Sequence, residues 1–161
     1  EVFTVQPFGN SLTTLTLSGD QIHILLEQQF TNCHAGNAPA SWNYPAGDAG
    51  QAFNRILQVS EGFTYSWSAA GPDCDKIAPE SIKLNGKVID PLLEYRVTVN
   101  NFLADGGDKF FILTKGKQRV GGAQDVDALE ACFAHPVNDA DSSRDGVQVA
   151  PGLQNRIIRL N

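Results

Sequence analysis

Two short stretches of the chain combine a phenylalanine with glycine and a compact polar side chain, a pattern suited to holding a flat ligand. The first reads Gln-Pro-Phe-Gly-Asn and contains Phe8 and Asn10. The second reads Asn-Asn-Phe-Leu-Ala-Asp-Gly-Gly-Asp and contains Phe102 and Asp108. Glycine lets a backbone approach a ligand closely, and an exposed phenylalanine offers a face on which a base can stack. An ordinary interpretation is also open, in which both phenylalanines are core side chains and the glycines form a plain turn.

The other candidates for chemistry fit structural roles. His23 falls on the flank of a predicted helix, His34 lies in a loop and His135 ends a second helix, so the histidines do not form a catalytic or metal-binding motif. The acidic stretch 139–146 has the alternating oxygen side chains of a calcium loop, but Gly152 stands where such a loop requires a glutamate. We interpret that stretch as a polar surface loop.

The three cysteines are too few and too scattered for a zinc site. Cys33 and Cys74 lie in polar loops, whereas Cys132 falls on the apolar face of a predicted helix. If any pair is bridged, we expect it to be Cys33 with Cys74, which leaves Cys132 as a buried thiol. We therefore expect no metal bound by this chain.

Composition indicates one folded, acidic domain spanning 1–161. The chain has 161 residues, of which 42% are hydrophobic and 19% charged, and its formal net charge is -6. These values allow a packed core in a single domain. The 12 lysines and arginines form no basic stripe, and no apolar run is long enough to span a membrane. We expect neither a nucleic-acid polymer nor a membrane as a partner.

Secondary-structure signals show which elements must position the two stretches. A capping box at Ser18 and Gln21 predicts a helix over 19–30, and a second helix is expected over 124–135. The buried stripe of that second helix is predicted to be Val126, Leu129, Cys132 and Phe133. Strands are predicted over 12–17, 55–59, 62–68, 81–84, 88–89, 95–100 and 110–114.

The connections between these elements also carry signals. Asn85 and Gly86 predict a type I′ hairpin turn. The basic cluster 115–119 is interpreted as a solvated loop, and the loop 31–51, which holds Trp42 and Tyr44, is expected to pack over the surface. Because strands and helices are segregated rather than alternating, the fold class is α+β.

Three motifs follow one another in an order that is typical of one protein family. The motifs Gln-Pro-Phe-Gly-Asn-Ser-Leu at 6–12, Arg-Ile-Leu-Gln-Val-Ser at 55–60 and Asn-Phe-Leu-Ala-Asp-Gly-Gly-Asp at 101–108 resemble the C-terminal domain of the secreted 5′-nucleotidase family. The chain resembles that domain from about residue 4 to the helix ending near residue 135. The resemblance implies a four-layer α/β/β/α fold that holds a nucleoside.

The resemblance also implies roles for four residues. Phe8 and Phe102 would sandwich the base, Asn10 would face the base edge, and the Asp108 carboxylate would accept hydrogen bonds from the ribose hydroxyls. Stacking on an aromatic side chain is worth about 1–3 kcal/mol per base. One departure stands at Lys109, where the family usually has glycine. If the position needs a positive φ, the lysine is strained; if it points inward, its ammonium could touch the ligand.

The family's chemistry lies outside this chain. It is a two-metal hydrolysis in an N-terminal metallophosphoesterase domain, and its phosphate-gripping arginines precede the stretch that holds Phe8. The chain begins at Glu1 and contains no methionine, which indicates a processed product or an excised piece. We therefore expect no catalytic residue and no cofactor here, and inactivity in isolation. We also expect the N-terminal domain of the same protein as a partner, and a periplasmic, secreted or cell-surface location.

Two alternatives remain open. The fold could serve as a non-catalytic binding or interaction module that uses another surface. The same pocket could also serve cyclic nucleotides or nucleotide sugars, because the reacting group would lie in the other domain.

Overall fold

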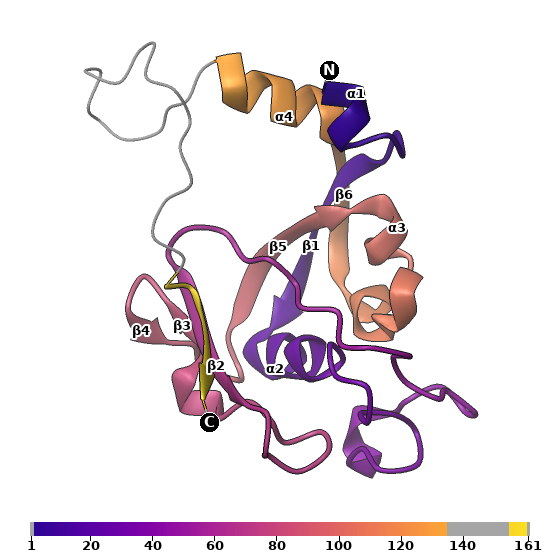
Figure 1. Ribbon diagram of the computed structural model, residues 1–161, viewed down its shortest axis with the longest axis vertical. Coiled ribbons are helices and arrows are strands. Elements are labelled where there is room, and N and C mark those ends of the chain that lie inside the picture. The colour runs from indigo at the N-terminus through magenta and orange to yellow at the C-terminus, as the bar shows by residue number, and fades with distance from the viewer. Residues whose placement is uncertain (1, 135–154, 161) are drawn as a thin grey trace.

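Two β-sheets organise the chain (Figure 1). The computed structural model describes residues 2–134 and 155–160. The first sheet has three strands in the order β5-β1-β6, and both outer strands run antiparallel to β1. The second has four strands in the order β4-β3-β2-β7, with β7 parallel to β2. The strands are β1 Ser11–Ser18, β2 Phe63–Ser68, β3 Lys83–Leu84, β4 Lys87–Val88, β5 Glu94–Asn100, β6 Lys117–Gln124 and β7 Ile157–Leu160.

Helices connect and flank these strands. The α-helices are α1 Val2–Val5, α2 Gly19–Glu27, α3 Asn101–Ala104 and α4 Asp125–Ala134. The 3₁₀ turns are η1 Ala40–Trp42, η2 Pro79–Ser81, η3 Gly107–Lys109 and η4 Phe111–Lys115. The mixed α+β class is confirmed, but the expected segregation is wrong, because helices and strands alternate along much of the chain.

The start of α2 follows its sequence signal. The Gln21 amide donates to Ser18 Oγ at 3.2 Å, and the Ser18 amide donates to Gln21 Oε1 at 2.9 Å, which completes the predicted capping box. The buried stripe Ile22, Leu25 and Leu26 faces the core. The α-helix ends at Glu27, three residues before the predicted end, and Phe30 is nevertheless fully buried.

The hairpin at Asn85 and Gly86 is confirmed. Their φ angles of 50° and 78° are the two positive values that a type I′ turn requires. Its first strand is shorter than predicted, because Ser81 belongs to η2 and only Lys83–Leu84 pairs with Lys87–Val88, and its second strand begins one residue earlier than predicted.

Three predicted elements are wrong. Residues 55–59 form no strand, because their backbone bonds go to Gln29 instead of to a neighbouring strand. The apolar run 110–114 belongs largely to η4, where each turn closes on itself, as in the Leu113 amide bond to the Phe110 carbonyl at 3.1 Å. The basic cluster 115–119 is not a loop: from Lys117 it is part of edge strand β6. A short apolar run does not distinguish strand from 3₁₀ turn.

The second long helix is confirmed as α4, but its buried stripe is only partly correct. Val126 is 3% exposed, whereas Phe133 is 54% exposed. The predictions for the Cys132 side chain, for His135 as the helix end and for the acidic stretch 139–146 lie outside what the structure describes.

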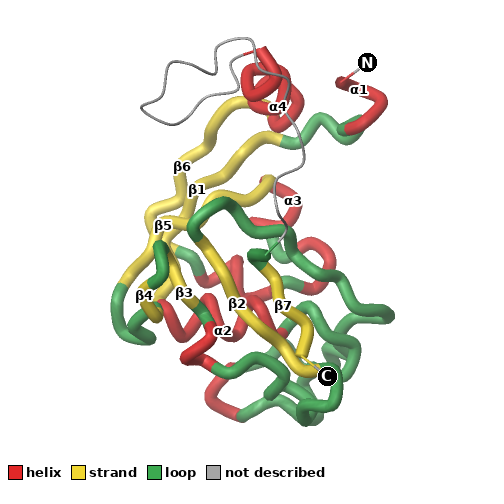
Figure 2. The backbone as a smooth tube through the Cα atoms, turned by 60° about the vertical axis from the view of Figure 1, so that its left-hand side comes forward, coloured by secondary structure: helices red, strands yellow, loops and turns green. Residues whose placement is uncertain are grey.

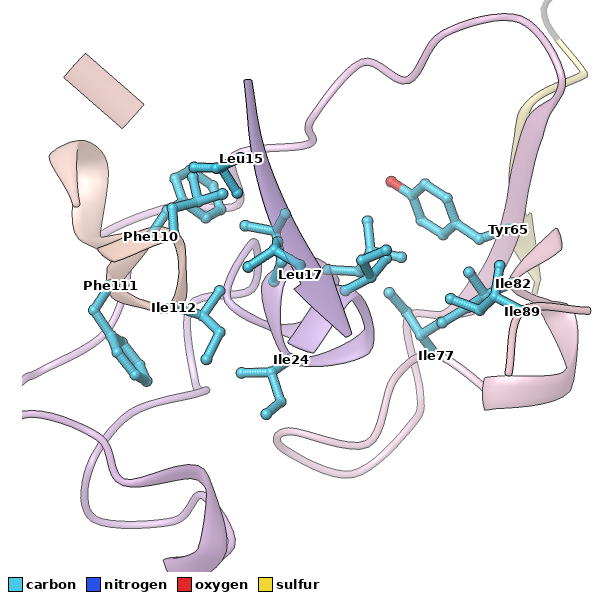
Figure 3. Packing of buried hydrophobic residues seen from close by; sticks show 14 of the residues in the cluster. Leu15, Leu17, Ile24, Tyr65, Ile77, Ile82, Ile89, Phe110, Phe111 and Ile112 are labelled. Carbon is cyan, nitrogen blue, oxygen red and sulfur yellow. The ribbon is translucent and has the colours of Figure 1, made fainter. Parts of the chain in front are cut away.

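One hydrophobic core joins both sheets and α2. It contains Leu15 and Leu17 from β1, Tyr65 from β2 and Phe110 beside η4, and Figure 3 shows these side chains grouped around α2. Trp42 and Tyr44 pack against this core, so the expected packing of loop 31–51 is confirmed.

A disulfide between Cys33 and Cys74 ties that loop to the turn after β2, as the sequence suggested for any bridged pair. Both cysteines are buried. The bridge closes a segment with a sequence separation of 41 residues, which restricts the unfolded chain.

Candidate functional site

Pairing of β1 with β5 brings the two sequence stretches to the same end of the first sheet. Leu12 at the start of β1 lies opposite Asn100 at the end of β5. The Ser11 amide also donates to Asn101 Oδ1 at 2.9 Å, so the two stretches are directly hydrogen-bonded. Figure 2 shows the chain entering β1 at the end of the sheet where α3 follows β5. Residues 90 positions apart thus become neighbours.

Phe8 lies in the turn between α1 and β1, and its side chain is 82% exposed. Gly9 follows with a φ of 62°, a conformation that favours glycine. Asn10 is half-buried, and its carbonyl accepts a hydrogen bond from the Asp125 amide at 2.8 Å. The turn is therefore fixed to the start of α4 while the Phe8 ring stays in solvent.

Phe102 lies on α3, and its side chain is 50% exposed. Asn100 caps this helix, because its Oδ1 accepts from the Leu103 amide at 2.8 Å. The ring rests against Gly107: a Cβ at that position would lie 2.6 Å from two ring carbons of Phe102. Gly107 therefore leaves the space that the ring occupies, and the interpretation of Phe8 and Phe102 as core side chains is wrong.

Asp108 follows in η3 with a φ of 49°, in the left-handed region. Its Oδ2 accepts from Arg55 Nη1 at 3.0 Å, and its carbonyl accepts from Gln51 Nε2. The carboxylate is thus presented by a turn that Gly106, with a φ of 85°, begins. Its side chain is 35% exposed, so water and ligands can reach it.

Lys109, the one departure from the family pattern, does stand at a position with a positive φ. Its φ is 62°, so a lysine there carries backbone strain. Its ammonium lies 3.7 Å from Asp48 Oδ1. The lysine therefore attaches its turn to loop 31–51.

Sequence reasoning missed three consecutive buried polar residues at the end of α2. Glu27, Gln28 and Gln29 are at most 1% exposed. Gln29 Oε1 accepts from the Leu57 amide at 2.6 Å and from the Tyr65 hydroxyl at 3.1 Å. We call this group the Glu-Gln-Gln anchor.

The other two members of the Glu-Gln-Gln anchor hold further loops. Glu27 Oε1 accepts from the Ile77 amide at 2.7 Å, and Gln28 Oε1 accepts from the Ile112 amide at 3.3 Å. The signal available in the sequence was the polar run Glu-Gln-Gln between Leu26 and Phe30, two residues that both had to be buried.

His23 has a structural role, as predicted. Its Nε2 donates to the Ile77 carbonyl at 3.0 Å and lies 3.6 Å from Glu27 Oε1. Burial alone would lower the pKa of His23. The hydrogen bond and negative charge of Glu27, helped by the Ile77 carbonyl and the charge of Asp20, outweigh burial and raise that pKa.

The resemblance assigns the two-metal chemistry to another domain, and the described residues offer no metal site of their own. Within 2–134 and 155–160, no three His, Cys, Asp or Glu side chains come together as a metal site. A cleft beside α2, lined in part by His23, Ile82 and Pro91, contains none of the four predicted site residues.

No described helix is long and apolar enough to cross a membrane.

The two sheets and their flanking helices define a mixed α+β type of domain, and comparison with known proteins identifies its family. Residues 1–115 match the model of the 5′-nucleotidase C-terminal domain. The chain belongs to this family, and the resemblance found from the sequence is confirmed.

Two proteins of Bacillus subtilis are similar to the chain in sequence. It is 31% identical over 115 residues to the trifunctional nucleotide phosphoesterase YfkN of Bacillus subtilis (strain 168), a match that covers 71% of this chain and 7% of that protein. It is 29% identical over 133 residues to the endonuclease YhcR of the same organism, covering 80% of this chain and 9% of that protein. The chain thus spans less than a tenth of either relative.

The crystal structure of a 5′-nucleotidase precursor from Thermus thermophilus matches the fold with a TM-score of 0.63. The match has 28% sequence identity and covers 99% of this chain and 27% of that chain. The two-sheet α+β architecture is therefore that of a 5′-nucleotidase C-terminal domain.

Proposed function

We propose that the chain is the nucleoside-recognition domain of a 5′-nucleotidase-like phosphoesterase. The base stacks between Phe8 and Phe102, Asn10 faces the base edge, and the Asp108 carboxylate accepts hydrogen bonds from the ribose hydroxyls. The phosphate ester is hydrolysed by a metal-dependent domain elsewhere in the parent protein, which is the chain's partner.

One observation carries this proposal: two exposed phenylalanines, Phe8 in a turn and Phe102 on α3, lie on segments that adjoin one end of a sheet. Exposed aromatic rings gathered in one region are typical of binding surfaces, and these have exposures of 82% and 50%. The Ser11–Asn101 hydrogen bond joins the start of β1, just after the Phe8 turn, to the start of α3. Asp108 stands on the turn against which Phe102 rests, because Gly107 immediately precedes it. Base, base edge and sugar would then be met from one end of the sheet.

Nucleotides are the substrate class that these groups fit best. Aromatic stacking tolerates different bases, because every base has a π face. Two of the matched proteins are named for nucleotides, one as a nucleotide phosphoesterase and the other as a 5′-nucleotidase precursor. Cyclic nucleotides and nucleotide sugars share the same nucleoside part, so the same pocket can serve them.

The wider setting of the domain is part of the proposal. In the parent protein the two sheets contribute to a four-layer α/β/β/α unit beside the catalytic domain. The Cys33–Cys74 disulfide supports a periplasmic, secreted or cell-surface location, because disulfides persist in oxidising compartments. Alkylation of free thiols in protein isolated from cells would leave this pair unmodified if the location is correct, and would label it if the protein resides in a reducing compartment.

The binding half is tested by calorimetry with adenosine. Phe102→Ala should weaken binding by about 1–3 kcal/mol, because one stacking face is lost. Phe133→Ala is the matched control, since Phe133 is a phenylalanine of similar exposure, 54%, on α4. Unchanged affinity in Phe102→Ala, or an equal loss in both variants, would count against the base sandwich.

The proposal that hydrolysis takes place in another domain is tested by adding adenosine monophosphate with Mn²⁺ or Zn²⁺ to the chain. The 161-residue chain should bind the nucleotide without releasing phosphate. Release of inorganic phosphate above the metal-only background would show that the chain carries its own catalytic site, and the division of labour proposed here would be wrong.

A further inference from the structure

We infer that Arg55 both positions Asp108 and contacts the ribose itself, so that the Arg55–Asp108 pair, rather than the carboxylate alone, selects a ribose with both hydroxyls. This inference rests on the proposed function, and it adds to it a residue outside the predicted set. In the sequence, Arg55 is the first residue of a family motif and of a predicted strand that the structure does not contain.

The first argument is the geometry of the pair. Arg55 Nη1 donates to Asp108 Oδ2 at 3.0 Å. In the part of the chain that the structure describes, Asp108 Oδ1 accepts no hydrogen bond. One oxygen is therefore fixed by the arginine and the other remains available. The side chains are 36% and 35% exposed, so the pair is at the surface and open to a ligand.

The second argument is that Arg55 is itself held from two sides. Its guanidinium carbon lies 4.4 Å from the centre of the Phe53 ring, a cation–π contact. Its amide donates to the Gln29 carbonyl at 2.8 Å, and Gln29 belongs to the fully buried Glu-Gln-Gln anchor. The backbone of Arg55 is thus attached to the core, and its side chain lies on an aromatic platform.

The third argument is that the same segment also holds the Asp108 backbone. Gln51 Nε2 donates to the Asp108 carbonyl, and Lys109 is paired with Asp48. The turn that presents the carboxylate is therefore held by three residues of segment 48–55. A side chain fixed in this way on both its backbone and its carboxylate is pre-organised for a ligand.

The chemistry of the pair matches a vicinal diol. A ribose hydroxyl can donate one hydrogen bond and accept others. The free Oδ1 of Asp108 can accept from a hydroxyl, and the guanidinium N–H groups that do not bind Oδ2 can donate to a hydroxyl oxygen. A sugar that lacks the two hydroxyls cannot make these hydrogen bonds, so water binds these groups instead and Arg55 adds nothing to the affinity.

The test compares adenosine with 2′,3′-dideoxyadenosine by calorimetry on the 161-residue chain. Arg55→Gln should lower adenosine affinity about tenfold, as expected for loss of a charge-assisted hydrogen bond, and should leave dideoxyadenosine affinity within about twofold. Arg55→Lys keeps the charge without the planar fork, so it should restore only part of the preference. Arg119→Gln, which breaks the exposed Arg119–Asp105 pair on the neighbouring turn, is the control and should change neither affinity.

The outcomes separate this inference from the proposed function. If Asp108→Asn loses the preference for adenosine but folded Arg55→Gln and Arg55→Lys keep it, the role of Arg55 is wrong and the nucleoside site stands. If Phe102→Ala and Asp108→Asn both bind adenosine as the wild type does, the nucleoside site itself is wrong, and the inference falls with it. The double variant Arg55→Gln, Asp108→Asn completes the test. If it loses no more adenosine affinity than Asp108→Asn alone, the two losses are non-additive and the two residues act as one unit.

Discussion

Two pairs of phenylalanines have opposite environments in the fold. Phe110 and Phe111 are 1% and 7% exposed, whereas Phe8 and Phe102 are 82% and 50% exposed. All four adjoin glycine-containing turns, so residue type and local motif do not separate them. What separates them is position: the buried pair packs under β1 beside α2, and the exposed pair lies beyond the end of β1 and β5.

The same contrast holds for polar side chains. The Glu-Gln-Gln anchor is buried and its amide and carboxylate oxygens bind backbone amides of three loops. Asp108 is partly exposed and keeps one oxygen free within the described part of the chain. The buried polar side chains of the Glu-Gln-Gln anchor thus fix the backbone of other segments. The exposed side chains at the end of the first sheet are held in place by backbone that is fixed in this way.

The largest expected effect separates the two phenylalanine pairs by stability. Phe110→Ala should lower the free energy of unfolding by about 3–5 kcal/mol, because it leaves a cavity in the core. Phe102→Ala should lower it by only about 0.5 kcal/mol, as for other surface substitutions. Urea unfolding followed by fluorescence measures both. Similar losses in the two variants would break the comparison.

An intermediate effect is expected from the disulfide, which braces the loop that carries Asp48. Cys33→Ser combined with Cys74→Ser should cost about 2–4 kcal/mol of unfolding free energy, mainly because the unfolded chain is less restricted. Reductant added to the wild type should reproduce the loss and should not affect the double variant. A double variant as stable as the oxidised wild type would mean that the bridge does not support this region.

The smallest effect concerns His23, which joins α2 to Ile77 on the buried side. Its pKa is raised in the folded state, so protonation favours folding; the stabilisation is fully present below the ordinary histidine pKa and is lost as the pH rises through the folded value. The unfolding free energy of the wild type relative to His23→Gln should therefore increase by about 0.3–0.5 kcal/mol on going from about pH 8 to about pH 5, the size of an i,i+4 helix pair.

Urea unfolding at several pH values measures this difference, and subtraction removes the contributions of the other titrating groups. A difference that stays constant, or that grows towards high pH, would contradict the pairing of His23 with Glu27.

Much of the fold followed from local signals. The capping box at Ser18 and the Asn85-Gly86 turn were confirmed because both depend on a few adjacent residues. Strand β6 was missed because its exposed Lys, Arg and Gly residues have little intrinsic preference for a strand, and pairing with β1 decides its conformation. The strand predicted over 55–59 is wrong for the converse reason. The sequence there favours a strand, but the backbone amides of Arg55 and Leu57 bind Gln29 and not a neighbouring strand.

For the candidate site, the sequence identified the residues but not their relationship. Phe8, Asn10, Phe102 and Asp108 were found through motifs, and their binding roles remain predictions. Arg55 and Gln51 were not assigned a role, because nothing in the sequence relates them to Asp108, which lies 53 and 57 positions further along the chain.

The sequence by itself determined the family, the start of α2, the Asn85-Gly86 hairpin and the phenylalanine-glycine stretches, because each depends on residues that are adjacent in the chain. Only the tertiary structure decided which phenylalanines are exposed, and that Arg55 fixes Asp108 while the Glu-Gln-Gln anchor fixes Arg55. Exposure and long-range hydrogen bonds depend on which segments share a space after the sheets pair and the core closes, and that is a property of the whole chain.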